Sequence, residues 1–182
     1  MLRPRVERLG YLGEFFRCAA HQPAALMSFM AFTEDLKRAL PDRITEVVAL
    51  TVSTELGNAY ERHQHERLSM KLGLGEAWIR AVEALAGVEL ARPLDELSDT
   101  DRHVQALTLA AIRRHGHNTS HELDEVVAAI GHEQAIAVLM LIGRYVTHAL
   151  IVNALELRPP VASPLSPTPA PAAMPSEGTG RA

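Results

Sequence analysis

The sequence of 182 residues has a single cysteine, Cys18, so it cannot form a disulfide bond within one chain. Disulfides belong mainly to secreted and periplasmic proteins, and their absence is typical of a reducing compartment. The N-terminal stretch 1–15 also lacks the uninterrupted apolar core of a signal peptide. These two absences predict a cytoplasmic protein.

Long apolar runs and basic stripes are missing as well. The longest apolar run, 135–143, ends at Arg144 and is far shorter than the roughly 20 residues that a membrane-spanning helix requires. The net charge is −4, and Lys and Arg are scattered singly or in pairs. Nucleic-acid binding depends on concentrated positive charge, so we expect neither nucleic acid nor a membrane as a partner.

The distribution of proline divides the chain into two parts. Seven of the eleven prolines lie within 158–182, together with many Ala and Ser residues. Proline removes a backbone donor, and this composition offers little apolar surface to bury. We therefore predict one folded domain over 1–157 and a Pro/Ala/Ser-rich disordered tail over 158–182.

The predicted domain has helical patterns throughout, bounded by prolines, capping residues and glycines. Apolar residues recur every three or four positions after Pro23, and Ser98 and Asp101 have the spacing of a capping box. The segment 132–157 is apolar nearly all round, which is typical of a helix buried on several sides. Strands have little support, so the predicted fold class is all-α. The expected helices cover 22–40, 41–56, 58–74, 75–87, 98–116, 119–131 and 132–157.

Titratable side chains are concentrated in the stretch 57–68. Residues three or four apart share a face of a helix, so Glu61 and His65 are predicted to lie together. If the preceding helix turns back near Gly57 and packs antiparallel, the rise of a helix places Glu46 about one turn from the residue facing His65. Glu46 stands among apolar neighbours, where a carboxylate needs a partner.

Two interpretations of this cluster remain open. In the first, carboxylates raise the basicity of His65, while desolvation and mutual repulsion raise a carboxylate pKa, as general acid–base catalysis requires. In the second, Glu61 and His65 form an exposed helix-stabilising pair, and Glu46 caps a helix or pairs with Arg43 or Arg62. Spacing alone favours the structural interpretation, because structural ion pairs outnumber catalytic ones.

A wider pattern surrounds the cluster. Glu46 lies early in one predicted helix, Glu61 precedes His65 by four residues, and a Gly-Leu turn follows at 73–74. This ordered set, within 41–82, resembles the carboxymuconolactone decarboxylase / alkylhydroperoxidase D-like family. The resemblance extends over about residues 20–160, and it shifts the interpretation of the cluster towards a functional site. It implies an all-helical alkylhydroperoxidase D-like domain with N-terminal helices, assembled as a homo-oligomer, commonly a trimer or hexamer.

The sequence departs from the peroxidase members of that family at two positions. Those members reduce peroxide with a Cys-x-x-Cys pair, whereas the matching positions here hold Asn58 and Glu61. Cys18 lies outside the motif and has no second cysteine to pair with. Alkylhydroperoxidase-type (peroxiredoxin) activity is therefore disfavoured, because it requires a redox thiol pair.

The resemblance instead implies a cofactor-free lyase of decarboxylase type, or a related isomerase or cyclase, acting on a small organic acid or lactone. Loss of carbon dioxide leaves a carbanion that must be stabilised and protonated. In this hypothesis His65 donates the proton, Glu61 orients it and Glu46 tunes it, which makes these three the expected catalytic residues. Further contacts with the small-molecule substrate are expected from Asn58, Arg62 and Tyr145.

An anionic substrate also needs a cation near the acidic cluster, and Arg43 and Arg62 are the nearest in sequence. The alternative hypothesis is a non-catalytic oligomeric binding or scaffold protein that retains Glu46 and His65 as structural residues. That hypothesis predicts a filled, dry site with no cavity beside it.

Three histidines, His115, His117 and His121, lie within seven residues between two predicted helices. Metal binding by this loop is weakly supported, because no Cys or carboxylate set accompanies it at a known ligand spacing. We expect a solvated loop here, and neither a metal nor a cofactor in the protein.

Overall fold

The computed structural model describes residues 13–85 and 96–166, and within these ranges it consists of helices joined by turns, without strands. The predicted all-α fold class is therefore confirmed. The expectations for 1–12, for 86–95 and for 167–182 lie outside the described residues. The helices, in chain order, are α2 (Glu14–Ala19), α3 (Pro23–Ala39), α4 (Asp42–Glu55), α5 (Ala59–Lys71), α6 (Glu76–Glu83), α7 (Asp99–Arg113) and α8 (Ser120–Ala154).

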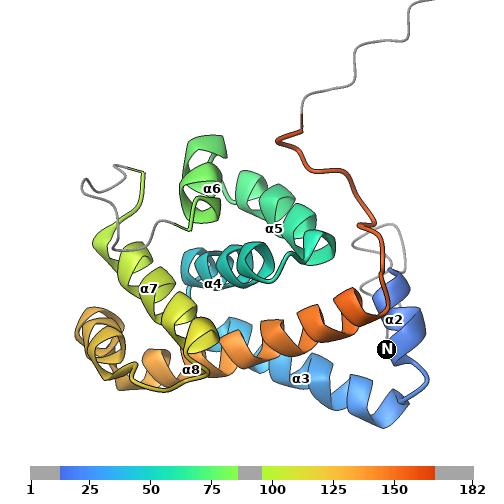
Figure 1. The fold of residues 1–182 in the computed structure, drawn as a ribbon, viewed down its shortest axis with the longest axis horizontal. Coiled ribbons are helices and arrows are strands. Elements are labelled where there is room, and N and C mark those ends of the chain that lie inside the picture. Colours follow the sequence, from blue (N-terminus) through green and yellow to red (C-terminus); the bar gives the residue numbers. More distant parts are fainter. Residues whose placement is uncertain (1–12, 86–95, 167–182) are drawn as a thin grey trace, which may run out of the picture.

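Helix α4 is the centre of the fold (Figure 1). Every residue from Ile44 to Ser53 is buried, because α5 and α6 cover one side of α4 while α7 and α8 cover the other. A helix surrounded in this way has no solvent-facing stripe, so a charged side chain on it needs a partner inside the protein. Glu46 is one of these side chains.

Helix α8 contains the most apolar sequence of the chain and is broken once. Gly131 has φ 82° and ψ 164°, which interrupts the helix at the boundary predicted between 119–131 and 132–157. The helix is long and apolar enough to cross a membrane by length and composition, but more than half of its most apolar window is buried inside the protein. Contacts with α3, α4 and α7 account for the buried part of that apolar sequence.

A tight turn joins α4 to α5 and sets their register. Gly57 adopts φ 63°, in the left-handed region that glycine enters without steric cost. Asn58 then caps α5, because its side-chain oxygen accepts a hydrogen bond from the backbone N–H of Glu61 at 3.1 Å. The two helices pack against each other as an antiparallel pair, so Glu46 comes to lie opposite His65.

Two parts of the structure differ from the sequence-based expectations. The short helix α2 was not predicted, because six residues are too few to show a helical period. Residues 158–166, which the prediction assigns to the tail, contact the domain in this structure. Leu165 packs against the main core, and its carbonyl accepts a hydrogen bond from Arg80 at 3.4 Å. The carbonyl oxygen of Val161 lies 3.2 Å from Nδ1 of His63. Three contacts therefore hold 158–166 against the domain despite its proline content.

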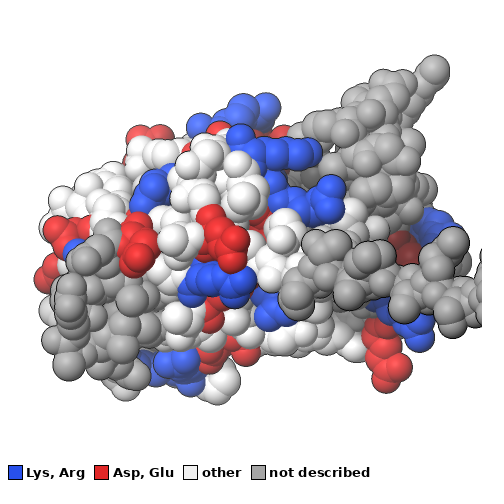
Figure 2. Space-filling view, turned by 90° about the horizontal axis from the view of Figure 1, so that it is seen from above, with Lys and Arg blue, Asp and Glu red and all other residues white. Residues whose placement is uncertain are grey.

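Positive and negative side chains are interspersed over the face shown in Figure 2, with uncharged surface between them. No unbroken basic stripe crosses the part of this face that the described residues form. Surface charge alone thus marks no site there, and the candidate site has to be located from cavities and buried polar groups.

Candidate active site

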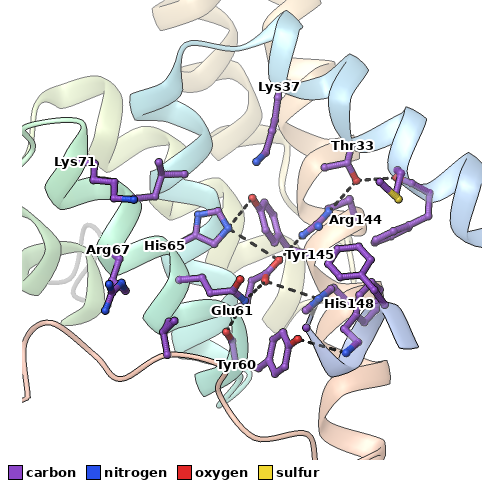
Figure 3. A pocket seen from close by; sticks show the side chains of 18 residues that line it. Thr33, Lys37, Tyr60, Glu61, His65, Arg67, Lys71, Arg144, Tyr145 and His148 are labelled. Atoms are coloured by element: carbon purple, nitrogen blue, oxygen red, sulfur yellow. Dashed lines mark hydrogen bonds and ion pairs between the residues drawn. The ribbon is translucent and has the colours of Figure 1, made fainter. Parts of the chain in front are cut away.

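A cavity of about 310 Å³ lies among α3, α5 and α8, with α2 and Val161 at its edge. Figure 3 shows the side chains that line it. The lining includes His65, Glu61 and Tyr145, which the sequence nominated, and several residues that it did not. The charged and titratable members of the lining are Lys37, Tyr60, Glu61, His65, Arg67, Lys71, Arg144, Tyr145 and His148.

His65 occupies the centre of a hydrogen-bonded chain. Its Nδ1 lies 2.8 Å from Oε2 of Glu46, an oxygen that also accepts from Ser69 Oγ at 3.1 Å. A carboxylate only accepts hydrogen bonds, so Nδ1 carries the ring proton and Nε2 of a neutral ring is the acceptor. The Tyr145 hydroxyl lies 3.2 Å from Nε2 and can donate to it. The chain Glu46–His65–Tyr145 therefore runs from the core to the cavity.

Glu61 lies beside one guanidinium and two imidazole groups. Arg144 Nη1 donates to Oε1 at 2.8 Å, His148 Nε2 lies 3.7 Å from Oε2, and His65 Nε2 lies 4.0 Å from Oε1. Burial raises the pKa of Glu61, but the positive charges of protonated His148, of Arg144 and of protonated His65 outweigh burial and hold that pKa well below its usual range. Glu61 is therefore ionised at neutral pH. The expectation that a carboxylate pKa rises in this cluster does not hold for Glu61.

Arg144 is a buried cation on the apolar half of α8. Its Nε donates to Thr33 Oγ1 at 3.1 Å, and its guanidinium lies over the rings of Tyr145 and Phe29, 4.3 and 5.1 Å from their centroids. In the sequence, Arg144 stands out only as the end of an apolar run. Its position was nevertheless a signal, because an arginine in a helix buried on several sides must have a buried anion nearby.

Helix α2 forms one wall of the site. The backbone N–H of Phe15 donates to the Tyr60 hydroxyl at 3.3 Å, and the Phe15 ring lies 4.2 Å from that of His148, centroid to centroid. Asn58 is buried behind this layer, where its Nδ2 lies 3.5 Å from His148 Nδ1. Asn58 therefore positions Glu61 and His148 and is not part of the cavity lining.

The two arginines nominated as substrate cations lie elsewhere. Arg62 points to another face of α5, where its Nε is 3.4 Å from Glu66. Arg43 forms a two-point ion pair with Asp101, through contacts of 3.0 and 2.5 Å, and its guanidinium covers Trp78. Neither arginine lines the cavity.

Three other cations line the cavity in their place: Lys37 from α3, and Arg67 and Lys71 from α5. Arg67 and Lys71 are exposed at its rim, while Lys37 is half-buried. No hydrogen bond or ion pair joins any of the three to another residue within 13–85 and 96–166. The sequence gives no sign that they converge, because Arg67 and Lys71 have the spacing of a solvent-facing pair on α5 and Lys37 lies far from them in the chain.

Comparisons with known proteins give matches among solved structures alone. No family model matches the chain, and no curated protein matches it. An alkylhydroperoxidase AhpD core protein from Ralstonia eutropha JMP134, described as an uncharacterized peroxidase-related protein, superimposes with a TM-score of 0.73 at 14% identity, over 87% of this chain and 82% of that one. The chain has the alkylhydroperoxidase D-like fold.

Two further structures share this fold. The debrominase Bmp8 in complex with 2,3,4-tribromopyrrole has a TM-score of 0.71 at 15% identity, over 86% of this chain and 81% of that one. A protein of unknown function from Agrobacterium tumefaciens, linked by its description to antioxidant defence and AhpD, has a TM-score of 0.67 at 20% identity, over 79% of this chain and 96% of that one. At such identities the likeness establishes the fold, and the chemistry has to be inferred from the site.

In this alkylhydroperoxidase D-like domain the cysteine lies apart from the site. Cys18 is on α2 and lines a second, apolar cavity with Leu26 and Ile151, and it is not among the residues lining the cavity around His65. No thiol is therefore positioned beside His65 in the described residues.

His115 and His117, in the loop before α8, and His121, in the first turn of α8, are exposed. His115 adopts φ 54°, as residues in tight turns do. Across the described parts of the chain, no group of three or more His, Cys, Asp or Glu side chains is arranged to hold a metal ion. The loop before α8 is thus a solvated connection in this structure.

Proposed function

We propose that the protein is a cofactor-free acid–base enzyme of decarboxylase type that acts on a small organic acid or lactone. The observation that carries this proposal is the chain Glu46–His65–Tyr145, which ends at a cavity of about 310 Å³ lined by cations. A buried carboxylate, an imidazole and a phenol in series form a proton relay, and a relay needs a cavity at its end in order to serve a substrate.

The geometry changes the roles that the sequence suggested. Glu46 contacts His65 at 2.8 Å and orients it, whereas Glu61 is 4.0 Å away and has Arg144 as its nearest partner. In the proposed reaction the protonated His65 is stabilised by Glu46. Tyr145 passes its hydroxyl proton to the substrate carbanion and recovers a proton from Nε2 of His65.

Lys37, Arg67 and Lys71 supply the positive charge that an anionic substrate needs. They have no anionic partner among the described residues, so a substrate carboxylate would be the counter-ion that the cavity lacks. In this proposal the three residues provide the cation that an anionic substrate requires, in place of Arg43 and Arg62.

The scaffold hypothesis is less well supported by this geometry. It expects Glu46 and His65 to saturate each other with no cavity alongside. Glu46 and His65 do pair, but the other ring nitrogen of His65 faces Tyr145 and the cavity. We therefore favour the enzyme.

We also propose that the enzyme is a homo-oligomer, a trimer or hexamer, in the cytoplasm. One face of α8 is exposed and apolar: Ile136, Met140 and Leu150 have exposed fractions of 54, 46 and 66%. These residues, with Gly143 and Thr147, recur at three- and four-residue intervals, so they form one stripe. Exposed apolar stripes of this kind mark protein contacts, and a second copy of the chain is the partner we propose.

The test of the enzyme proposal is release of carbon dioxide from a panel of keto acids and carboxylated lactones by wild type, His65→Gln and Tyr145→Phe. We expect wild type to be faster than His65→Gln by a factor on the order of 10² to 10⁴. Equal rates for wild type and both variants, with all three correctly folded, would overturn the proposed roles.

A further inference from the structure

The chain has two lysines, Lys37 and Lys71, against sixteen arginines, and both lysines line the same cavity. Everywhere else in the sequence, fixed positive charge is supplied by guanidinium groups. Arginine stays protonated at any ordinary pH, whereas a lysine amine can lose its proton and act as a nucleophile. The position of the two amines therefore suggests that the cavity uses amine chemistry as well as positive charge.

Lys37 has the geometry of a nucleophile. It extends from α3 into the cavity in Figure 3, on the side where His65, Tyr145 and Arg144 also point. Its side chain is half-buried, and its amine has no hydrogen bond or ion pair with any other residue of 13–85 or 96–166. Lys71 differs, because it is exposed at the rim.

The surroundings of Lys37 favour its neutral form. Burial lowers the pKa of the Lys37 amine, and the nearby guanidinium of Arg144 lowers it further. Glu46, Glu61 and Glu34 act in the opposite direction, but they do not restore the pKa to its usual value. More of the amine is therefore unprotonated near neutral pH than in an exposed lysine.

We infer that Lys37 is a covalent catalytic residue that forms an imine with the carbonyl group of an aldehyde or keto acid. This inference rests on the proposed function, because it takes the same cavity and the same acid–base chain. It narrows the substrate class to acids that carry a ketone or aldehyde, and it excludes a simple lactone.

The chemistry balances without any further reagent. The neutral amine attacks the carbonyl carbon, the carbonyl oxygen takes up a proton supplied by His65 through Tyr145, and that oxygen leaves as water to give a positively charged iminium. In a 3-keto acid, the bond to the carboxyl carbon then breaks, its electron pair forms the carbon–carbon double bond of an enamine, and carbon dioxide departs. Tyr145, supplied by His65, protonates the enamine carbon, and water hydrolyses the imine to release the ketone and the Lys37 amine.

The experiment is reductive trapping. Full-length protein is incubated with acetoacetate and sodium cyanoborohydride, and the modified amine is located by peptide mass spectrometry. With two lysines and the N-terminal amine in the chain, each site can be measured separately. We expect label on Lys37 in wild type and in Lys71→Arg, and complete loss of that label in Lys37→Arg, with folding checked by circular dichroism.

The kind of adduct separates this inference from the proposed function. An isopropyl adduct shows that decarboxylation preceded reduction, whereas an adduct that keeps the carboxyl group shows imine formation alone. Acetoacetate can also lose carbon dioxide spontaneously to give acetone. A parallel incubation with acetone therefore measures how much isopropyl adduct forms from the free ketone. Carboxylated adducts on Lys37 in both wild type and His65→Gln would support the imine and contradict the decarboxylase. Absence of label on Lys37, or label confined to Lys71 and the N-terminus, would overturn the imine even if carbon dioxide were released.

Discussion

Glu46 and His65 lie 19 positions apart in sequence, and Oε2 of the one is 2.8 Å from Nδ1 of the other. Both side chains are almost completely buried, with exposed fractions of 2 and 6%. The pairing fixes which ring nitrogen carries the proton, and it directs the other nitrogen toward Tyr145 at the cavity. The pair can therefore contribute both to the stability of the fold and to acid–base chemistry. Substitutions have to distinguish these two contributions.

His65→Gln is expected to lower turnover by a factor on the order of 10² to 10⁴, because glutamine can keep hydrogen bonds to Glu46 and Tyr145 but cannot shuttle a proton. The melting temperature, measured on the same preparation, should change little. If His65 serves only as the partner of a buried carboxylate, the ranking reverses, and the variant loses on the order of 3 kcal/mol of unfolding free energy. Tyr145→Phe is the matched control, because it removes the hydroxyl at the cavity end of the chain and leaves the contact between Glu46 and His65 in place.

Arg144→Met is expected to destabilise the protein by on the order of 3 kcal/mol, because it leaves the ionised Glu61 buried without its nearest cation. Chemical denaturation measures this loss. The double variant Arg144→Met with Glu61→Gln should recover part of it, because the uncompensated charge is then gone. Additive losses in the double variant would show that Arg144 stabilises the fold through its ring contacts rather than through Glu61.

Glu83→Gln is expected to remove part of the pH dependence of stability. Burial, followed by the charge and hydrogen bond of Glu66, raises the pKa of Glu83 from 4.5 to about 7. The folded state thus holds a proton that the unfolded state releases, so this contribution is fully present below pH 4.5 and lost as pH rises to about 7. Thermal melts from pH 5 to 8 should show a steeper fall for wild type than for Glu83→Gln. Parallel curves for the two proteins would contradict the raised pKa.

Cys18→Ser should leave every activity unchanged, and neither protein should reduce hydroperoxides with thiol reductants. The reason is positional, because the two places of a redox pair hold Asn58 and Glu61, and Cys18 lines a different cavity. A peroxide-reducing activity that disappears in Cys18→Ser would show that the Cys18 thiol on α2 takes part in the reaction.

Leu165→Asp is expected to cost about 2 kcal/mol of unfolding free energy, because Leu165 packs against the main core and a carboxylate there would lose its hydration. Ala162→Asp places the same charge on the same segment at an exposed position and should have almost no effect. Equal stability of the two variants would show that the contacts of 158–166 contribute nothing to the fold.

The helices, the turn at Gly57 and the Glu46–His65 pair could be predicted because each rests on local spacing. Periodicity locates helices, and two helices joined by a tight turn have few possible registers. Lys37 and Arg144 could not be placed in the same way. They reach the cavity from α3 and α8, and the position of these helices relative to α5 is a long-range property that no spacing along the chain encodes. The pairing of Glu61 with Arg144 could not be predicted for the same reason, since the two residues lie 83 positions apart.

The tight turn at Gly57 also bears on the order in which the site assembles during folding. The bond between His65 and Glu46 closes a loop of 19 residues, whereas the bond between His65 and Tyr145 closes one of 80. Loop-closure entropy makes the longer contact costlier by about 1 kcal/mol before any packing is gained. The α4–α5 hairpin can therefore form with the histidine already oriented, and the late arrival of α8 completes the relay. A chain in which α8 has not yet docked would hold an oriented imidazole with no phenol beside it, so the chain of Glu46, His65 and Tyr145 would still be incomplete.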